Sequence, residues 1–250
     1  LALEYDVKAI QDAGLIEDGW INEFDKDSSP YTSTIVFLVR KGNPQNIKDW
    51  GDLVKDGVGV ITPNPKTSGG ARWNYLAAWA YADKLYNGDE TQIEAFIKKL
   101  YENVLVLDSG ARGATTSFVE NNQGDVLIAW ENEAFLSVQE NPDEYEIVTP
   151  SISILAQPSV AVVDDVVDQR GTRNVATECL SYLYSDEAQR IAGDNFYRPS
   201  NPDILNEYAD TFDLNINLVT IQDFGGWDEV QKKHFDDGGV FDRIYEKTDK

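Results

Sequence analysis

Two short glycine-containing turns carry groups that could bind an anion. Each turn follows an apolar run and opens into a helical pattern: Ser68-Gly69-Gly70 forms the first, and Gly110-Ala111 belongs to the second. The first turn of a helix presents unpaired N–H groups and the positive end of the helix dipole, which together favour an anion. Glycine has no Cβ, so a ligand can approach the backbone of Gly69 and Gly70 closely.

Two side chains add further hydrogen-bond donors. The Ser68 hydroxyl can donate a hydrogen bond, and the indole of Trp130, at the end of another apolar run, can only donate. Each feature has a simpler interpretation, since such a turn is usually a helix cap and a lone tryptophan usually belongs to the core or its rim. Two such turns at neighbouring strand ends favour an anion site built from uncharged donors.

The elements around these residues predict an α/β fold. Strand-like runs alternate with helical runs over short connections, which indicates a largely parallel sheet whose strand ends bind the ligand. The helix after Gly70 places Trp73, Leu76, Ala77 and Ala80 on one apolar stripe. Strands are expected at 34–39, 58–61, 104–107, 126–130 and 145–148, and helices at 6–16, 49–55, 70–87, 89–101, 111–121, from 131, and at 172–192 with a fresh N-cap at Ser185.

The composition excludes several kinds of partner and cofactor. Asp and Glu number 44 against 21 Lys and Arg, a formal net charge of −23, so nucleic acid and anionic membranes are poor partners. The same charge opposes long-range steering of an anion, so any anion site must act through short-range hydrogen bonds. Cys179 and His234 are the only cysteine and histidine, which excludes an internal disulfide and a His-rich metal site. We expect no metal and no cofactor.

Nothing in the sequence points to catalysis. There is no GxGxxG, GxxxxGK[ST] or GxSxG motif, and no spacing selects a glycosidase pair among the many carboxylates. We therefore expect a protein that is not an enzyme and has no catalytic residues. One alternative stays open: an enzyme could hold a phosphorylated substrate on the same helix N-termini, with His234 as its only histidine for a general base.

Longer motifs resemble those of the periplasmic sulfate- and thiosulfate-binding proteins, the solute-binding proteins of ABC importers. The similarity spans essentially all 250 residues and is carried by 29–34, 39–44, 64–75, 110–116, 224–227, 238–239 and 241–242. It implies the two-lobed α/β periplasmic binding protein fold of type II, with hinge crossovers and a cleft between the lobes. It also implies an exported, periplasmic, monomeric receptor that delivers sulfate to a membrane permease.

The resemblance also implies roles for individual residues. Arg72 and Arg112 would brace the binding loops from behind, although a solvated salt bridge is the simpler interpretation of both. Sulfate, thiosulfate and another tetrahedral oxyanion such as molybdate all stay open as ligands. Donors alone would favour fully ionised sulfate over phosphate, which keeps a proton. The sulfate contacts that the resemblance implies are Ser68, Gly69, Gly70, Ala111 and Trp130.

The expected lobes are discontinuous in sequence. Residues 35–158 form one lobe, and 1–34 combine with 159–250 in the other, with hinge crossovers near 31–34 and 154–159. Family chains begin earlier, with a strand, a serine-containing glycine-rich loop and a helix. We therefore expect this opening segment, which brings further ligands of the first lobe, and a signal peptide upstream of Leu1.

Overall fold

The computed structural model describes residues 1–245, which form two compact units. Unit 1 comprises Leu1–Ser33 and Ala156–Leu214, and unit 2 comprises Thr34–Leu155 together with the chain from Asn215 onwards. The chain therefore passes between the units three times, after Ser33, Leu155 and Leu214. None of the helices in the described part is long and apolar enough to cross a lipid bilayer.

The C-terminal segment corrects one of the expected boundaries. We expected 159–250 to share a lobe with 1–34, but the chain from Asn215 belongs to unit 2. Strand β11 (Asn217–Val219) pairs in parallel with β8 (Ile152–Ile154), and the ring of Trp227 contacts that of Trp73 edge to face at 4.8 Å. The strand pairing and the ring contact place the C-terminal segment in unit 2. The segment consists of loops and short helices, and it has no periodic sequence pattern from which these contacts could be predicted.

A five-stranded sheet forms the centre of unit 2. Strand β4 is parallel to β5 and β6, whereas β3 is antiparallel to β6 and β7, so the expected largely parallel sheet is mixed. Strand β3 is almost fully buried, and a run that is apolar on both faces fits an interior strand of either direction. The order across the sheet is β5 (Val104–Asp108), β4 (Val60–Pro63), β6 (Val126–Trp130), β3 (Ile35–Arg40) and β7 (Tyr145–Val148).

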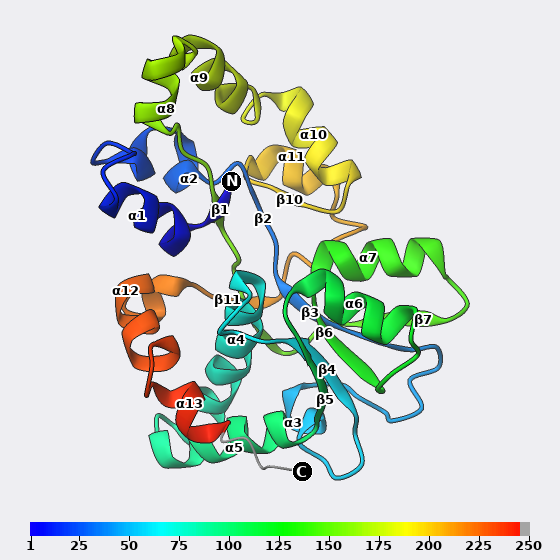
Figure 1. Ribbon diagram of the computed structural model, residues 1–250. Helices are drawn as coiled ribbons and strands as arrows, with labels where there is room; N and C mark the ends of the chain where they lie inside the picture. Colours follow the sequence, from blue (N-terminus) through cyan, green and yellow to red (C-terminus); the bar gives the residue numbers. More distant parts are fainter. Residues whose placement is uncertain (246–250) are drawn as a thin grey trace. The chain divides into compact units, whose positions relative to one another are not determined.

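Helices cover this sheet on both faces. Phe118 of α6 and Ala134 of α7 pack in one core cluster with Val36 and Leu38 of β3. Phe37 points to the opposite face and meets Trp50 of α3 edge to face at 4.7 Å. Figure 1 shows the helices of unit 2, which are α3 (Trp50–Leu53), α4 (Gly69–Tyr86), α5 (Glu90–Glu102), α6 (Ala111–Val119), α7 (Glu131–Glu140), α12 (Trp227–Val230) and α13 (Val240–Ile244).

The expected apolar stripe of α4 is confirmed. All four of its residues, Trp73, Leu76, Ala77 and Ala80, are buried. A stretch of 3-10 helix (Ile221–Phe224) precedes α12, and a π-helical turn, Gln231–Phe235, follows it. These short elements lead the chain back over α4 and α5, where Phe241 meets the ring of Tyr101 at 5.1 Å.

Unit 1 contains short helices and two small antiparallel strand pairs. Strand β1 (Ala2–Leu3) pairs with β9 (Pro158–Ser159), and β2 (Tyr31–Thr32) pairs with β10 (Arg198–Pro199). The expected N-cap at Ser185 is confirmed, because its Oγ accepts a hydrogen bond from the Ala188 amide at 3.2 Å. The helices are α1 (Glu4–Asp12), a 3-10 turn (Trp20–Asn22), α2 (Asp25–Ser28), α8 (Asp164–Arg170), α9 (Arg173–Tyr182), α10 (Asp186–Asp194) and α11 (Pro202–Glu207).

Candidate functional site

Three neighbouring parallel strands of unit 2 end where the candidate residues lie. Strand β4 runs through a loop, 64–68, into α4, and β5 runs through Ser109 and Gly110 into α6. Trp130 is the last residue of β6 and stands directly before α7. Because β4 is parallel to both β5 and β6, the three carboxyl ends share one edge of the sheet.

The loop before α4 holds Ser68 as a helix cap. Its Oγ accepts a hydrogen bond from the Ala71 amide at 3.3 Å, and its own amide donates to the carbonyl of Asn64 at 2.9 Å. This cap leaves Gly69 and Gly70 in the first turn of α4, where backbone N–H groups have no carbonyl partner within the helix. Both amides therefore stand at the positive end of an 18-residue helix.

Trp130 lies against this first turn. Its Nε1 donates to the carbonyl of Gly70 across 3.4 Å, which is long for such a bond. A Cβ added to Gly70 would stand 3.1 Å from Trp130 Nε1 and 3.6 Å from Ser68 Oγ. The structure thus brings Ser68, Gly70 and Trp130 together, and a Cβ at position 70 would crowd the indole.

The second turn is tied to the first. Thr67 Oγ1 donates to the carbonyl of Ser109 at 2.9 Å, and the amide of Asn64 donates to the carbonyl of Asp108 at 2.7 Å. Ala111 is the first residue of α6, after an extended Gly110, so its N–H also lacks a partner within its helix. The two helix N-termini are therefore held next to each other by hydrogen bonds between their loops.

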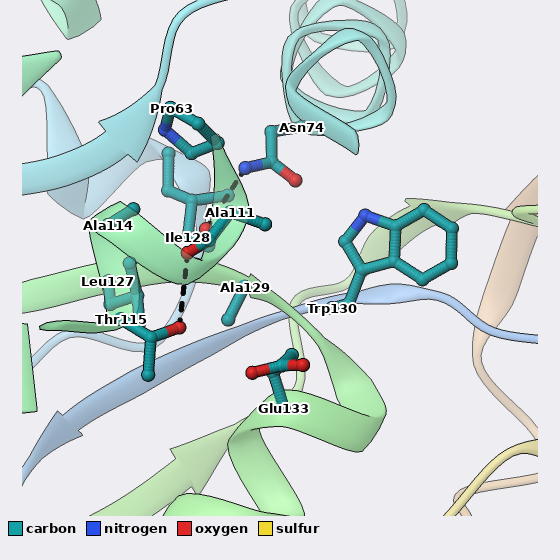
Figure 2. A pocket seen from close by; sticks show the side chains of 10 residues that line it. All are labelled: Pro63, Asn74, Ala111, Ala114, Thr115, Leu127, Ile128, Ala129, Trp130 and Glu133. Carbon is teal, nitrogen blue, oxygen red and sulfur yellow. Dashed lines mark hydrogen bonds between the residues drawn. The ribbon is translucent and has the colours of Figure 1, made fainter. Parts of the chain in front are cut away.

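Ala111 and Trp130 line one pocket at this edge of the sheet (Figure 2). Its wall also holds two hydrogen-bond acceptors that the sequence reasoning missed. The Asn74 side chain donates through Nδ2 to the carbonyl of Ile128 at 3.0 Å, while its buried Oδ1 has no hydrogen-bond partner among the described residues. The carboxylate of Glu133 is the other acceptor.

These acceptors correct the expectation of a site lined by donors alone. A spacing signal for them exists in the sequence. Asn74 follows Gly70 by four residues within α4, and residues at this spacing share a helix face. Glu133 lies in the first turn of α7, three residues after Trp130, which stands directly before that helix. Side chains that lie one turn after a helix N-terminus are therefore candidates to line the same site as its N–H donors.

The two candidate bracing arginines differ. Arg72 Nε donates to the carbonyl of Pro65 at 3.2 Å, and its guanidinium lies 5.6 Å from the ring centroid of Phe235. Arg72 thus contacts the loop before α4 through the carbonyl of Pro65. The side chain of Arg112 is exposed and makes no hydrogen bond or ion pair within residues 1–245, so this geometry gives it no loop to brace.

His234 lies away from these donors. It is buried between the rings of Trp79 and Tyr75, and its Nδ1 is 3.0 Å from the Tyr75 hydroxyl. Burial, with smaller contributions from the charges of Lys233 and Arg243, lowers the pKa of His234 to about 3. It lines a pocket other than the one beside Trp130. Within the described residues, no group of three or more His, Cys, Asp or Glu could hold a metal ion.

Comparison with known proteins identifies the family. Residues 2–198 match the family described as bacterial extracellular solute-binding protein. The chain is 58% identical over 246 residues to the sulfate-binding protein of Escherichia coli K12, covering 98% of this chain and 74% of that protein. It is 50% identical over 242 residues to the thiosulfate-binding protein of Pseudomonas aeruginosa, covering 96% and 73%.

A solved structure agrees with these relatives. The sulfate-binding protein SubI from Mycobacterium tuberculosis H37Rv superposes with a TM-score of 0.84 at 33% identity, over 94% of this chain and 80% of that one. The α/β binding-protein fold expected from the sequence is thereby confirmed. This chain belongs to the bacterial extracellular solute-binding proteins.

Proposed function

We propose that this protein is a periplasmic receptor that captures inorganic sulfate and delivers it to the membrane permease of an ABC importer. One observation carries the proposal: unpaired amides of two adjacent helix N-termini and the indole of Trp130 converge at one edge of a sheet. The names of the relatives from Escherichia coli and Mycobacterium tuberculosis support sulfate as the ligand.

The chemistry of these groups suits a fully ionised oxyanion. Sulfate offers only acceptors, and the amides of Gly69, Gly70 and Ala111 together with the Trp130 indole offer only donors. Helix termini supply partial positive charge without a charged side chain. A protein with a net charge of −23 can therefore hold a dianion through local dipoles, although its overall charge does not attract one.

The proposed mechanism is closure of a two-lobed receptor on the ion. The chain crosses between units 1 and 2 after Ser33, Leu155 and Leu214, and these three crossings are the candidate hinges. Sulfate shifts the population toward the closed form, and the closed monomer docks on the permease. No covalent step is involved, and no metal or cofactor is needed.

Thiosulfate is the second candidate ligand. The relative from Pseudomonas aeruginosa named as a thiosulfate-binding protein is 50% identical to this chain, close to the 58% of the sulfate-binding relative. Thiosulfate is also a fully ionised tetrahedral anion with acceptors only, so the same donors can hold it. The choice between the two anions rests on how the pocket accommodates the larger terminal sulfur.

Isothermal titration calorimetry with inorganic anions alone tests the proposal. We expect one saturable site for sulfate without any organic substrate, and competition by thiosulfate. An enzyme that acts on a phosphorylated substrate would instead require the organic part of its substrate and a general base near Trp130. Absence of sulfate binding in the folded protein would overturn the proposal.

A further inference from the structure

Lys66 connects the loop before α4 to the C-terminal segment, and it is not one of the residues proposed to bind the anion. Lys66 Nζ donates to the carbonyl of Phe235 at 2.9 Å, to Asp242 Oδ2 at 3.0 Å and to Asp237 Oδ1 at 3.3 Å. Its own amide donates to Asn64 Oδ1 at 2.9 Å, which shapes the turn. All three hydrogens of the ammonium group are therefore directed at the C-terminal segment.

The C-terminal segment is shaped to receive this ammonium group. Asp242 also accepts a hydrogen bond from the amide of Gly238 at 2.8 Å, which fixes its carboxylate toward Lys66. Gly238 has a φ of +78°, and a Cβ added to Gly239 would stand 2.8 Å from the carbonyl oxygen of Asp236. The turn at residues 236–242 therefore favours glycine at both positions.

Electrostatics support a charged contact at neutral pH. Burial opposes the charge of Lys66, but its hydrogen bonds with Asp242 and Asp237 raise its pKa above the ordinary value. The Gly238 amide, followed by Lys66, holds the pKa of Asp242 below its usual range. The Lys66 side chain is 26% exposed and that of Asp242 is 37% exposed, so solvent screens this contact only in part.

The same segment also contacts the beginning of α4. Arg72, which donates to the carbonyl of Pro65 in the loop, lies 5.6 Å from the ring of Phe235. One turn later, the Tyr75 hydroxyl is 3.0 Å from His234 Nδ1. The loop and the first two turns of α4 therefore rest on residues 234–242.

We propose that Lys66 and Asp242 are positioning residues that hold the loop before α4, and with it the amides of Gly69 and Gly70, in the geometry that binds the anion. This inference rests on the proposed function. Neither residue needs to touch the ion. Their contact instead fixes the start of α4, and amides held in place lose less entropy when they bind a ligand.

The substitution Asp242→Asn separates positioning from simple charge. It removes a negative charge from unit 2, so electrostatics alone would make anion binding tighter. An asparagine keeps the shape and can still accept the bond from Gly238, but it loses the ion pair with Lys66. Positioning predicts weaker binding, by about threefold to tenfold, because a partly exposed ion pair of good geometry contributes modestly.

The experiment is calorimetric titration of sulfate into the full chain and its variants at constant ionic strength. Lys66→Met is expected to weaken binding at least as much as Asp242→Asn, and Lys66→Arg is expected to stay within about twofold of the parent because it keeps donors and charge. The double variant that combines Lys66→Met with Asp242→Asn should be no weaker than Lys66→Met alone, since both changes break the same contact.

Two matched controls complete the design. Asp237→Asn removes the same charge from a fully exposed side chain with the longer 3.3 Å contact, and Asp56→Asn breaks an exposed ion pair with Lys99 elsewhere in unit 2. Both are expected to bind sulfate like the parent. Parent-like or tighter binding by Asp242→Asn, or parent-like binding by Lys66→Met, would overturn the inference. Absence of sulfate binding in the parent would instead overturn the proposed function, so the two failures are distinguishable.

Discussion

Replacing Trp130 with phenylalanine isolates one hydrogen bond of the proposed site. The indole Nε1 lies 3.1 Å from the position that a Cβ of Gly70 would occupy and 3.4 Å from the Gly70 carbonyl oxygen. The contact with the carbonyl is long and competes weakly with a sulfate oxygen. Phenylalanine keeps most of the ring but has no donor, so the ion loses one partner while the packing around the side chain is largely kept.

The expected loss is that of a hydrogen bond to a charged acceptor. Such a bond contributes about 1.5–3 kcal/mol, so the sulfate Kd of Trp130→Phe should rise roughly tenfold to a hundredfold. Calorimetric titration of sulfate measures this change directly. Thermal denaturation without sulfate should differ little from the parent, because Trp130 is only half-buried and the contact that it loses is weak.

Trp50→Phe is the matched control in the same unit. Trp50 is fully buried, its Nε1 donates to the carbonyl of Ile152 at 2.8 Å, and it does not line the pocket beside Trp130. The substitution removes one hydrogen bond to a buried carbonyl and should lower stability by about 1 kcal/mol without changing the sulfate Kd. If Trp130→Phe binds sulfate as tightly as the parent, the indole is a packing residue and the reasoning on its donor is wrong.

Three further predictions follow from single contacts. Gly70→Ala should raise the sulfate Kd about tenfold, because the added Cβ crowds the Trp130 indole. Gly110→Ala should leave the Kd unchanged in the same titration, because a Cβ at position 110 meets no atom within 4 Å and the backbone there is extended. Ser68→Ala should lose about 1 kcal/mol of stability and also weaken sulfate binding, whereas Ser185→Ala, which removes the equivalent cap of α10, should lose only stability in thermal denaturation. Burial lowers the pKa of His234 from 6.5 to about 3, so between these values the unfolded chain binds a proton at His234 that the folded chain does not. The stability is therefore unaffected by this group above about pH 6.5 and decreases as the pH falls below it. The Tm of the parent should drop between pH 7 and 5, and that of His234→Gln should drop less.

Local patterns in the sequence were sufficient to predict the elements that carry the donors. The stripe of α4 from Trp73 to Ala80 and the cap at Ser185 depend on spacing and on one side chain each, and both are found in the structure. The helix start after Ser68 follows from the same local chemistry. These features need no contact with distant parts of the chain, which is why the sequence alone predicts them.

Features that depend on distant contacts could not be predicted in the same way. The direction of β3 is set by pairing with β6 and β7, and an apolar run such as Ile35–Arg40 carries no sign of direction. The chain from Asn215 joins unit 2 through β11 and through rings that pack on α4 and α5. The helical spacing of Asn74 and the place of Glu133 just after Trp130 are visible in the sequence, but their meeting on one pocket wall depends on how α4, α6, β6 and α7 pack together.

Competition between sulfate and phosphate tests the central claim most directly. Sulfate is titrated into the folded protein from pH 5 to 8, alone and with an equal concentration of phosphate. We predict one saturable site with nearly constant affinity and no competition by phosphate, because the amides of Gly69, Gly70 and Ala111 and the Trp130 indole cannot accept the proton that phosphate keeps. The discrimination can reach about 10⁴-fold when the pocket acceptors Asn74 and Glu133 do not contact the ion. Equal binding of phosphate, abolished in Glu133→Gln, would mean that the pocket's acceptors take part in recognition. That result, or no sulfate binding at all, would contradict a sulfate receptor built from donors.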